Sequence, residues 1–296
     1  MCAAISQSEY LAEHLVPDSG PVCWSDGAAR IAVAADRGHT SLRDLYQSDP
    51  CRVLFPRPAS GSPFEGIVVT TSGGIVGGDR IALRIEAGDN SVATFTTQAA
   101  EKIYRSAGAD SRIAIELTVG MDSLLEWMPQ ETILFDGARL RRATNIEVAP
   151  GSRLLCGELI VFGRRARGET FTRGFLHDSW RIKEGCRLIW ADALHLADDI
   201  DGIMNRASSF DGAACYATVI YRADDAGVHL DKVREILRDS PDDRCLAAAT
   251  CLESLLIMRF LGSDAAATRR AVSSFWSGFR VAVLDLPARL PRVWET

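Results

Sequence analysis

Four glycine turns recur at nearly constant spacing through the middle of the chain. They lie at Gly88, Gly120, Gly151 and Gly185, which are 32, 31 and 34 residues apart. Segments rich in Ile, Val, Leu and Thr flank each turn and alternate between apolar and polar residues, as β-strands do. A unit of this size cannot bury its apolar face alone, but stacked neighbours can. The spacing therefore predicts a mainly β fold, a stacked or coiled assembly of strands; a meander of hairpins is the alternative, because it also gives regular turns.

The period of the pattern changes after residue 225, and about two helices are predicted in the C-terminal third. Apolar residues at helical spacing predict one helix over 228–239. Asp264 is the candidate N-cap of a second helix that runs to Leu284. Residues 251–261 between them are predicted to form a buried strand. Because no linker-like stretch interrupts the pattern, we expect a flexible tail over residues 1–24 and a single domain over 25–296.

Charge and composition narrow the classes of function. The net charge is −6 and the pI is about 5.5, so the chain lacks the basic surface that drives binding to nucleic acid. It has neither an apolar run of roughly 18–20 residues nor a signal-peptide pattern, and we expect a cytoplasmic protein without a membrane partner. The eight cysteines and five histidines are scattered, without the local spacing of a zinc site, which indicates no tightly bound metal.

The string TTSGGIVGGDR, residues 70–80, is the most conspicuous motif. It matches neither a P-loop nor a dinucleotide-binding fingerprint, and an alternating strand pattern rather than a helix follows it. No G-x-S-x-G nucleophile elbow occurs elsewhere. The motifs therefore favour a protein that is not an enzyme.

Acidic residues fall at matching positions after the turn glycines. Glu158 and Asp192 each lie seven residues after a turn glycine, and strand parity directs them to the same side as their apolar neighbours. Glu126 lies six residues after its glycine. Buried carboxylates need a partner or a cation, so a row of them would suit a path for a divalent ion bound through oxygen. The equally weighted alternative is pairing with arginines from two clusters: Arg139, Arg141 and Arg142, or Arg164, Arg165 and Arg167.

Several longer strings resemble one family, the urease accessory proteins called UreD or UreH. They are SGGIVGGDRI, EKIYRS, EWMPQETILFDGARLRR, CGELIVFGRRARGETFTRG, RFLG and LPRVWET, in the family's order over about residues 40–296. The resemblance implies a mainly β, non-catalytic urease maturation factor. It also implies that UreF and the GTPase UreG join the chain in a complex that docks on apo-urease and inserts nickel, with GTP bound by the partner. A homodimer within that complex is a further arrangement that we consider.

The resemblance also implies a transient nickel path through the interior. The positions that match the family's motifs give its candidate residues, which are Asp79, Glu126, Glu131, Glu158 and Asp192. This chain departs from the family at Glu101, where an acid precedes Lys102, and Glu101 is therefore an additional, doubtful candidate.

Two other hypotheses remain open from the sequence. The first is a hydrolase that uses paired carboxylates as general acid and base. The second is a docking subunit that nickel never enters, with aromatic anchors at Phe275, Trp276 and Phe279, although such residues more often belong to a core.

Overall fold

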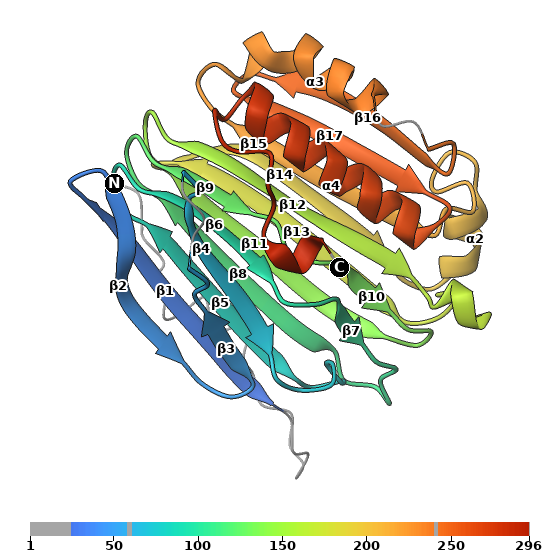
Figure 1. The fold of residues 1–296 in the computed structure, drawn as a ribbon. Coiled ribbons are helices and arrows are strands. Elements are labelled where there is room, and N and C mark those ends of the chain that lie inside the picture. Colours follow the sequence, from blue (N-terminus) through green and yellow to red (C-terminus); the bar gives the residue numbers. More distant parts are fainter. Residues whose placement is uncertain (1–24, 58–60, 240–241, 296) are drawn as a thin grey trace.

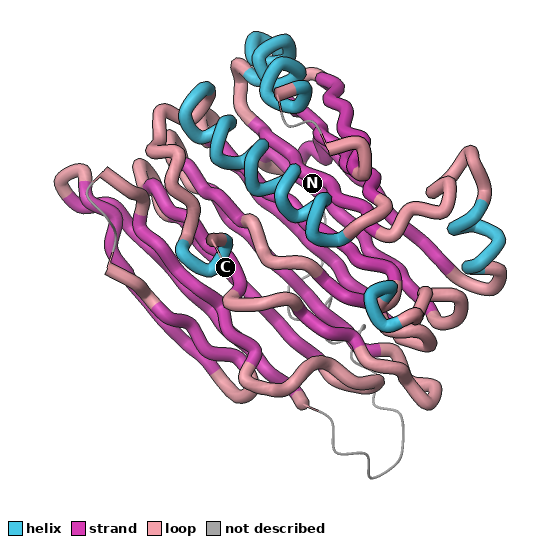
Figure 2. The backbone as a smooth tube through the Cα atoms, turned by 45° about the vertical axis from the view of Figure 1, so that its right-hand side comes forward, coloured by secondary structure: helices cyan, strands magenta, loops and turns pink. Residues whose placement is uncertain are grey.

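The computed structural model describes residues 25–57, 61–239 and 242–295. Two β-sheets lie face to face, and helices cover the outer face of one of them (Figures 1 and 2). The seven-stranded sheet contains β1 (Asp26–Asp36), β2 (His39–Gln47), β5 (Arg80–Ala87), β8 (Ser111–Val119), β11 (Arg139–Val148), β13 (Phe175–Glu184) and β14 (Arg187–Leu196). The predicted tail over residues 1–24 lies outside the described residues.

The second sheet has ten strands. They are β3 (Cys51–Leu54), β4 (Phe64–Thr70), β6 (Val92–Thr97), β7 (Glu101–Ile103), β9 (Leu124–Trp127), β10 (Thr132–Leu134), β12 (Arg153–Phe162), β15 (Cys215–Arg222), β16 (Cys245–Leu252) and β17 (Leu255–Gly262). In its centre, β4, β6, β9 and β12 run parallel, as do β5, β8, β11 and β13 in the other sheet.

The chain passes repeatedly from one sheet to the other, so that successive coils stack. Gly88, Gly120 and Gly151 each lie between a strand of the seven-stranded sheet and the next strand of the ten-stranded sheet. A Cβ atom at Gly120 would approach the backbone nitrogen of Asp89, in the turn below, to 2.7 Å. Only glycine lets the turns stack this closely. The predicted coiled β assembly is confirmed.

The fourth glycine turn is different. Gly185 joins β13 to β14 in an antiparallel hairpin within the seven-stranded sheet. The coil therefore ends there, and the hairpin alternative is correct for this turn alone.

Two helices pack on the ten-stranded sheet, and both were predicted. They are α3 (Leu230–Arg238), which follows the 3-10 turn η2 (Ala226–His229), and α4 (Ala265–Ala282). Figures 1 and 2 show α3 and α4 over the end of the sheet that contains β15, β16 and β17. The backbone N–H of Ala267 donates to the Asp264 side chain at 2.8 Å, which confirms the predicted N-cap.

One strand boundary and several short helical elements differ from the sequence prediction. The buried strand predicted over 251–261 is confirmed for residues 255–261, which belong to β17, but its predicted start is wrong. β16 ends at Leu252, and a turn that contains Glu253 with positive φ separates the two strands. The short helix α2 (Ile200–Asn205) and the 3-10 turns η1 (Arg165–Arg167) and η3 (Arg292–Trp294) were not predicted. Among the described residues, no helix is long and apolar enough to cross a membrane.

Buried apolar side chains form three clusters, one of which includes Leu140, Phe162 and Leu176. Strand residues such as Phe95, Leu154 and Trp180 pack between the two sheets. Residues of the opposite strand parity, such as Met128 and Leu155, pack against α4. Phe275, Trp276 and Phe279 are fully buried in this same cluster. The expectation that such residues belong to a core is confirmed, and they are not available as docking anchors, because α4 turns its aromatic face to the sheet.

Candidate functional site

Glu158 lies between the two sheets in a buried cluster of charges. It shares strand parity with Leu154 and Cys156, which belong to the inter-sheet core, as the turn spacing predicted. Across the interface, Arg142 of β11 and Asp178 of β13 are in-register neighbours on parallel strands. Arg142 donates from Nε and Nη2 to Asp178 at 2.9 Å and 2.6 Å, and Nη2 also forms an ion pair with Glu158. One guanidinium thus holds two carboxylates.

Further hydrogen bonds complete this cluster. Trp180 donates from Nε1 to Glu158 Oε1 at 3.0 Å, and Arg142 Nη1 donates to the Thr132 hydroxyl at 2.9 Å. Every charged member is nearly inaccessible to solvent. Such a network is stable only when each member has its partners.

The two carboxyl groups differ in their affinity for protons. Burial, with the nearby charge of Asp178, raises the pKa of Glu158 well above its usual value, against the opposing effect of Arg142. Burial acts in the same direction on Asp178, but the charge of Arg142 and its hydrogen bonds outweigh that effect and lower the pKa of Asp178. Asp178 is therefore the carboxylate that pairs with Arg142, and Glu158 is the more readily protonated partner.

A small cavity of about 70 Å³ adjoins Glu158 and reaches the edge strand β14. Asp192 of β14 lies on this cavity and pairs with Arg259 of β17, with about one third of each side chain exposed. The Thr218 hydroxyl lines the cavity and accepts a hydrogen bond from Arg259 at 3.2 Å. The structure therefore brings Glu158 and Asp192 to one polar cavity, with space for one or two water molecules.

Glu126 and Glu131 lie on the opposite side of the ten-stranded sheet, toward α4. Glu126 is fully buried and accepts hydrogen bonds from Thr94 Oγ1 at 2.5 Å and Trp276 Nε1 at 2.6 Å. Arg280 of α4 pairs with it at 3.2 Å. Burial raises the pKa of Glu126, although Arg280 and the hydrogen bonds oppose this. These contacts attach α4 to β9.

Glu131 has a similar attachment near the C-terminus. Arg269 of α4 donates from Nη1 to Glu131 Oε2 at 2.9 Å and contacts the neighbouring Gln130. Gln130 Nε2 in turn donates to the backbone oxygen of Val293 at 2.7 Å. The acid is therefore part of a link between β10, α4 and the C-terminal segment.

Asp79 stabilises the turn that the glycine string forms. Its Oδ1 accepts the backbone N–H of Ser25 at 2.7 Å, and its Oδ2 accepts that of Val76 at 2.9 Å. A Cβ at Gly77 would lie 2.1 Å from the Ser106 hydroxyl oxygen. The glycines of the 70–80 string thus allow this loop to pack closely against the loop that contains Ser106.

Glu101, the additional candidate for the nickel path, accepts a hydrogen bond from a threonine. Thr70 donates its hydroxyl to Glu101 at 2.8 Å, and burial raises the pKa of Glu101 above its usual value.

The five predicted acids do not form one continuous row. Glu158 and Asp192 meet between the sheets, Glu126 and Glu131 face α4, and Asp79 holds a loop. The arginine-pairing hypothesis applies to four of the five, but of the six arginines named for it only Arg142 pairs with a predicted acid. The other partners are Arg259, Arg269 and Arg280.

Asp178 was missed because it precedes the turn glycine instead of following it. Its position beside Glu158 depends on the pairing of β13 with β11, which the sequence pattern does not specify. Over residues 25–57, 61–239 and 242–295, no group of three or more His, Cys, Asp or Glu side chains is arranged to hold a metal ion.

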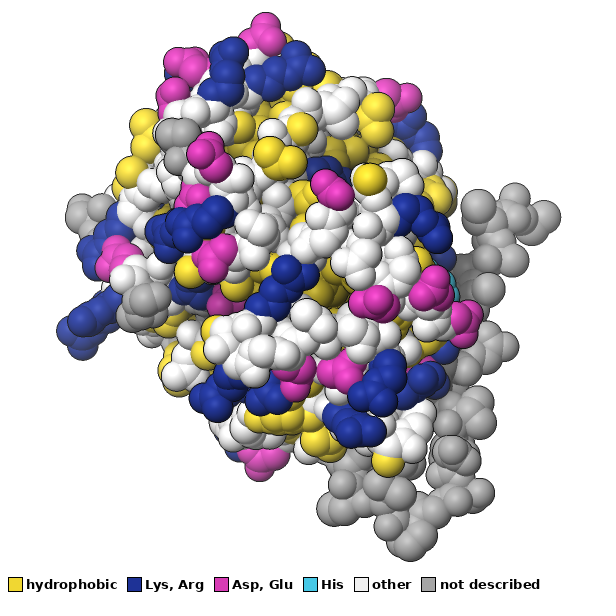
Figure 3. All heavy atoms as spheres, turned by 90° about the vertical axis from the view of Figure 1, so that its right-hand side faces the viewer, with side chains coloured by type: hydrophobic (Ala, Val, Ile, Leu, Met, Phe, Trp, Pro, Cys, Tyr) yellow, Lys and Arg dark blue, Asp and Glu magenta, His cyan; other side chains and the backbone are white. Residues whose placement is uncertain are grey.

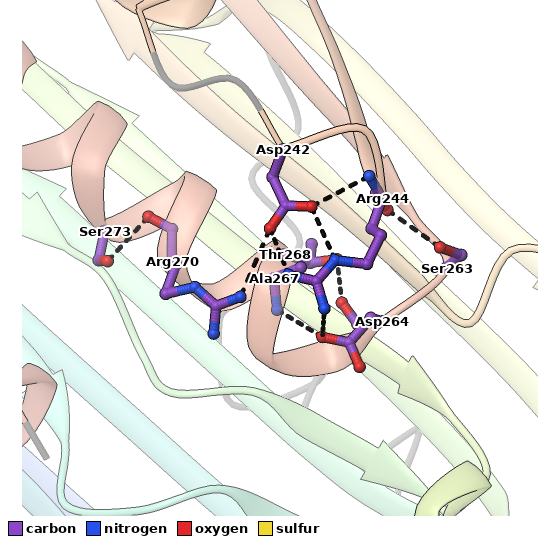
Figure 4. A network of polar contacts seen from close by, with 8 residues as sticks. All are labelled: Asp242, Arg244, Ser263, Asp264, Ala267, Thr268, Arg270 and Ser273. Carbon is purple, nitrogen blue, oxygen red and sulfur yellow. Dashed lines mark hydrogen bonds and ion pairs between the residues drawn. The ribbon is translucent and has the colours of Figure 1, made fainter.

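A separate polar network fixes the N-terminal end of α4 (Figure 4). Asp242 accepts two hydrogen bonds from the Arg244 guanidinium at 2.8 Å each, and Arg270 of α4 approaches the same carboxylate at 3.4 Å. The hydrogen bonds from Arg244 lower the pKa of Asp242 well below its usual value. This network joins the segment before β16 to α4.

Comparison with known proteins gives a consistent result. The sequence model of the family described as UreD urease accessory protein matches residues 25–295. A urease accessory protein UreD of Magnetococcus marinus is 40% identical over 94% of this chain and 96% of its own length. The UreD proteins of a Methylobacterium species and of Brucella suis are 41% and 35% identical, over 90% and 93% of this chain and 94% and 96% of their own lengths.

Proposed function

The chain belongs to the UreD family of urease accessory proteins, and on that premise we propose that it is a non-catalytic scaffold for nickel insertion into apo-urease. In this proposal it acts in the cytoplasm with UreF and UreG, and UreG supplies GTP hydrolysis. The observation that carries the proposal is the match along residues 25–295, together with relatives named as urease accessory proteins over nearly their whole length. A role in urease maturation follows from the family itself.

The cavity beside Glu158 is the part of the interior best suited to passing nickel. Glu158, Asp178 and Asp192 offer carboxylate oxygens there, and Thr218 and Tyr216 add hydroxyl-bearing side chains. Oxygen ligands suit a borderline divalent cation that has to leave again, whereas thiolates and imidazoles would hold it more firmly. In the proposed transit, nickel takes over acid oxygens that arginines occupy in the free chain.

In this proposal, Arg259 and Arg142 regulate the access of nickel to the cavity. Arg259 pairs with Asp192 where the cavity approaches the surface, and Arg142 holds the deeper acids. Each ion pair holds a carboxylate in place without a bound metal. Nickel has to compete with both guanidinium groups, which favours brief occupancy over storage.

Exposed apolar residues supply a surface for partner proteins. Leu246 and Leu252 lie on β16, the edge strand of the ten-stranded sheet, and are 70% and 52% exposed. Leu188 on the edge strand β14 is 51% exposed. On the face of the molecule seen in Figure 3, hydrophobic areas lie between interspersed acidic and basic side chains. Apolar areas rimmed by charge are typical of docking surfaces, and we propose that one of the partners covers this edge.

The proposal is tested in cells that depend on this chain for urease activity. Deleting its gene should reduce urease activity to background, and the wild-type chain should restore it. The double variant Glu158→Gln with Asp192→Asn should restore activity poorly, while Asp231→Asn, on the exposed side of α3, should restore it fully. The same assay applied to Asp79→Asn, Glu126→Gln and Glu131→Gln tests whether these acids also contact nickel.

The possible results separate the two parts of the proposal. Undiminished urease activity after deletion would contradict a role in maturation. Full restoration by the double variant would contradict the nickel path while leaving the maturation role intact.

A further inference from the structure

A second cavity, of about 330 Å³, lies beside the C-terminal segment and away from the Glu158 cluster. Figure 1 shows this segment returning past α4 toward η3 over the ten-stranded sheet. Four arginines from three parts of the chain line the cavity, and Glu65 of β4 is the one acid among the lining residues. The arginines are Arg57, Arg280, Arg289 and Arg292.

Positive charge exceeds negative charge in this cavity. Arg280 also pairs with Glu126 on its far side, and Arg289 pairs with Glu295 at 3.9 Å, so three carboxylates stand against four guanidinium groups. The chain as a whole carries a net charge of −6, which makes a local excess of arginine notable. Gathering like charges at one cavity raises the free energy of the folded chain unless an anion offsets it.

Arg280 has unused hydrogen-bonding capacity. The residue is 3% exposed, its Nη1 donates to the backbone oxygen of Arg289, and its Nη2 pairs with Glu126. Its Nε is one of three buried side-chain nitrogen or oxygen atoms, within the described residues, that have no hydrogen-bond partner. A buried donor without a partner is unfavourable, and the Arg280 side chain is among those that line the cavity.

Three prolines restrict the backbone that lines the cavity. Pro56, Pro63 and Pro291 contribute to the lining along with Leu290. Proline fixes the backbone, which reduces the entropy lost when a ligand binds. The volume is at the lower end of the range for small-molecule sites.

We propose that this cavity is a binding site for an oxyanion of the carboxylate or phosphate type, held by Arg280, Arg289, Arg292 and Arg57. Planar guanidinium groups recognise both kinds of oxyanion through paired hydrogen bonds. The anion is either a small free molecule or the acidic side chain of a partner protein, since both present the same chemistry. Binding would tie the C-terminal segment to α4 and β4.

The test measures thermal unfolding of the full-length chain with three probes: inorganic phosphate, acetate and a short glutamate-rich peptide. Sodium chloride at the same ionic strength corrects for general screening. At least one probe should raise Tm saturably by about 2–4 °C. Arg289→Gln with Arg292→Gln should abolish the shift, and Arg206→Gln, an exposed arginine outside the cavity, should retain it.

The probes also separate the two sources of the anion. Stabilisation by phosphate or acetate at low concentration would indicate a free anion, and stabilisation by the peptide alone would indicate a partner's side chain. The absence of a saturable shift with every probe would overturn the proposal. So would an equal shift in the double variant, since the anion would then bind elsewhere.

Discussion

Arg142 and Asp178 form a two-point ion pair in the space between the sheets, with Nε–Oδ1 and Nη2–Oδ2 distances of 2.9 Å and 2.6 Å. Removing Arg142 would leave Asp178 as an uncompensated buried charge and deprive Glu158 of its cation. We expect Arg142→Met to lower the free energy of unfolding by about 3–5 kcal/mol. Urea unfolding measures this change.

Arg139→Met is the matched control for that prediction. Arg139 lies on the same strand, but it pairs with Asp110 in a partly exposed site, where 33% and 13% of the two side chains are exposed. Its loss should cost about 0–1 kcal/mol. Equal effects of the two substitutions would show that the buried cluster has no special importance for stability.

Glu158 should make the stability of the chain depend on pH above about 4.5. Its pKa is raised in the folded state, so the folded chain keeps a proton that the unfolded chain has lost. The free energy of unfolding therefore falls as pH rises from the unfolded pKa toward the folded one. In Glu158→Gln this contribution is absent, and the stability of the variant relative to wild type should rise between pH 5 and pH 8. A constant difference over that range in urea unfolding would refute the assignment.

Asp136 should contribute with the opposite sign. Partial burial opposes its ionisation, but hydrogen bonds from Arg173 and from Thr172 outweigh this and lower the pKa to about 2. The stabilisation is present above the unfolded pKa, near 3.8, and is lost as pH falls toward 2. Asp136→Asn should be less stable than wild type by about 1–3 kcal/mol at pH 7. Denaturant unfolding should show that this deficit shrinks on acidification; a deficit that persists at pH 2 would contradict the prediction.

Trp276 should anchor α4 through Glu126. The indole donates to Glu126 Oε1 at 2.6 Å in a fully buried site. Trp276→Phe removes this donor and should reduce the free energy of unfolding by about 1.5–3 kcal/mol, as expected for a hydrogen bond to a charged group. Trp190→Phe, at a half-buried position, is the control for ring size. If both variants lose the same stability, packing alone accounts for the effect.

The part of the fold that depends on local repetition could be predicted. Stacking of the units at Gly88, Gly120 and Gly151 follows from spacing and alternation, and Asp264 marked the start of α4. The hairpin at Gly185 could not be distinguished from a further coil, because both need the same turn residue. The turn between β16 and β17 was not predicted, because Glu253 adopts positive φ there although it is neither glycine nor asparagine.

The site was only partly predictable. Strand parity placed Glu158 between the sheets, but it could not assign Glu126 to the opposite face, because one residue of difference in the turn reverses the direction of a side chain. Arg259, Arg269 and Arg280 come from the C-terminal third, more than 60 residues from the acids with which they pair. Such pairs depend on how the last strands and α4 pack, which periodicity does not specify.

The most direct test of the maturation role is reconstitution from purified components. Apo-urease, UreF and UreG are incubated with nickel and GTP, with or without this chain, and the nickel bound per urease active site is measured together with urea hydrolysis. We predict that both quantities rise only when the chain is present and that the chain alone hydrolyses no urea. Equal nickel content and equal activity without the chain would contradict the account.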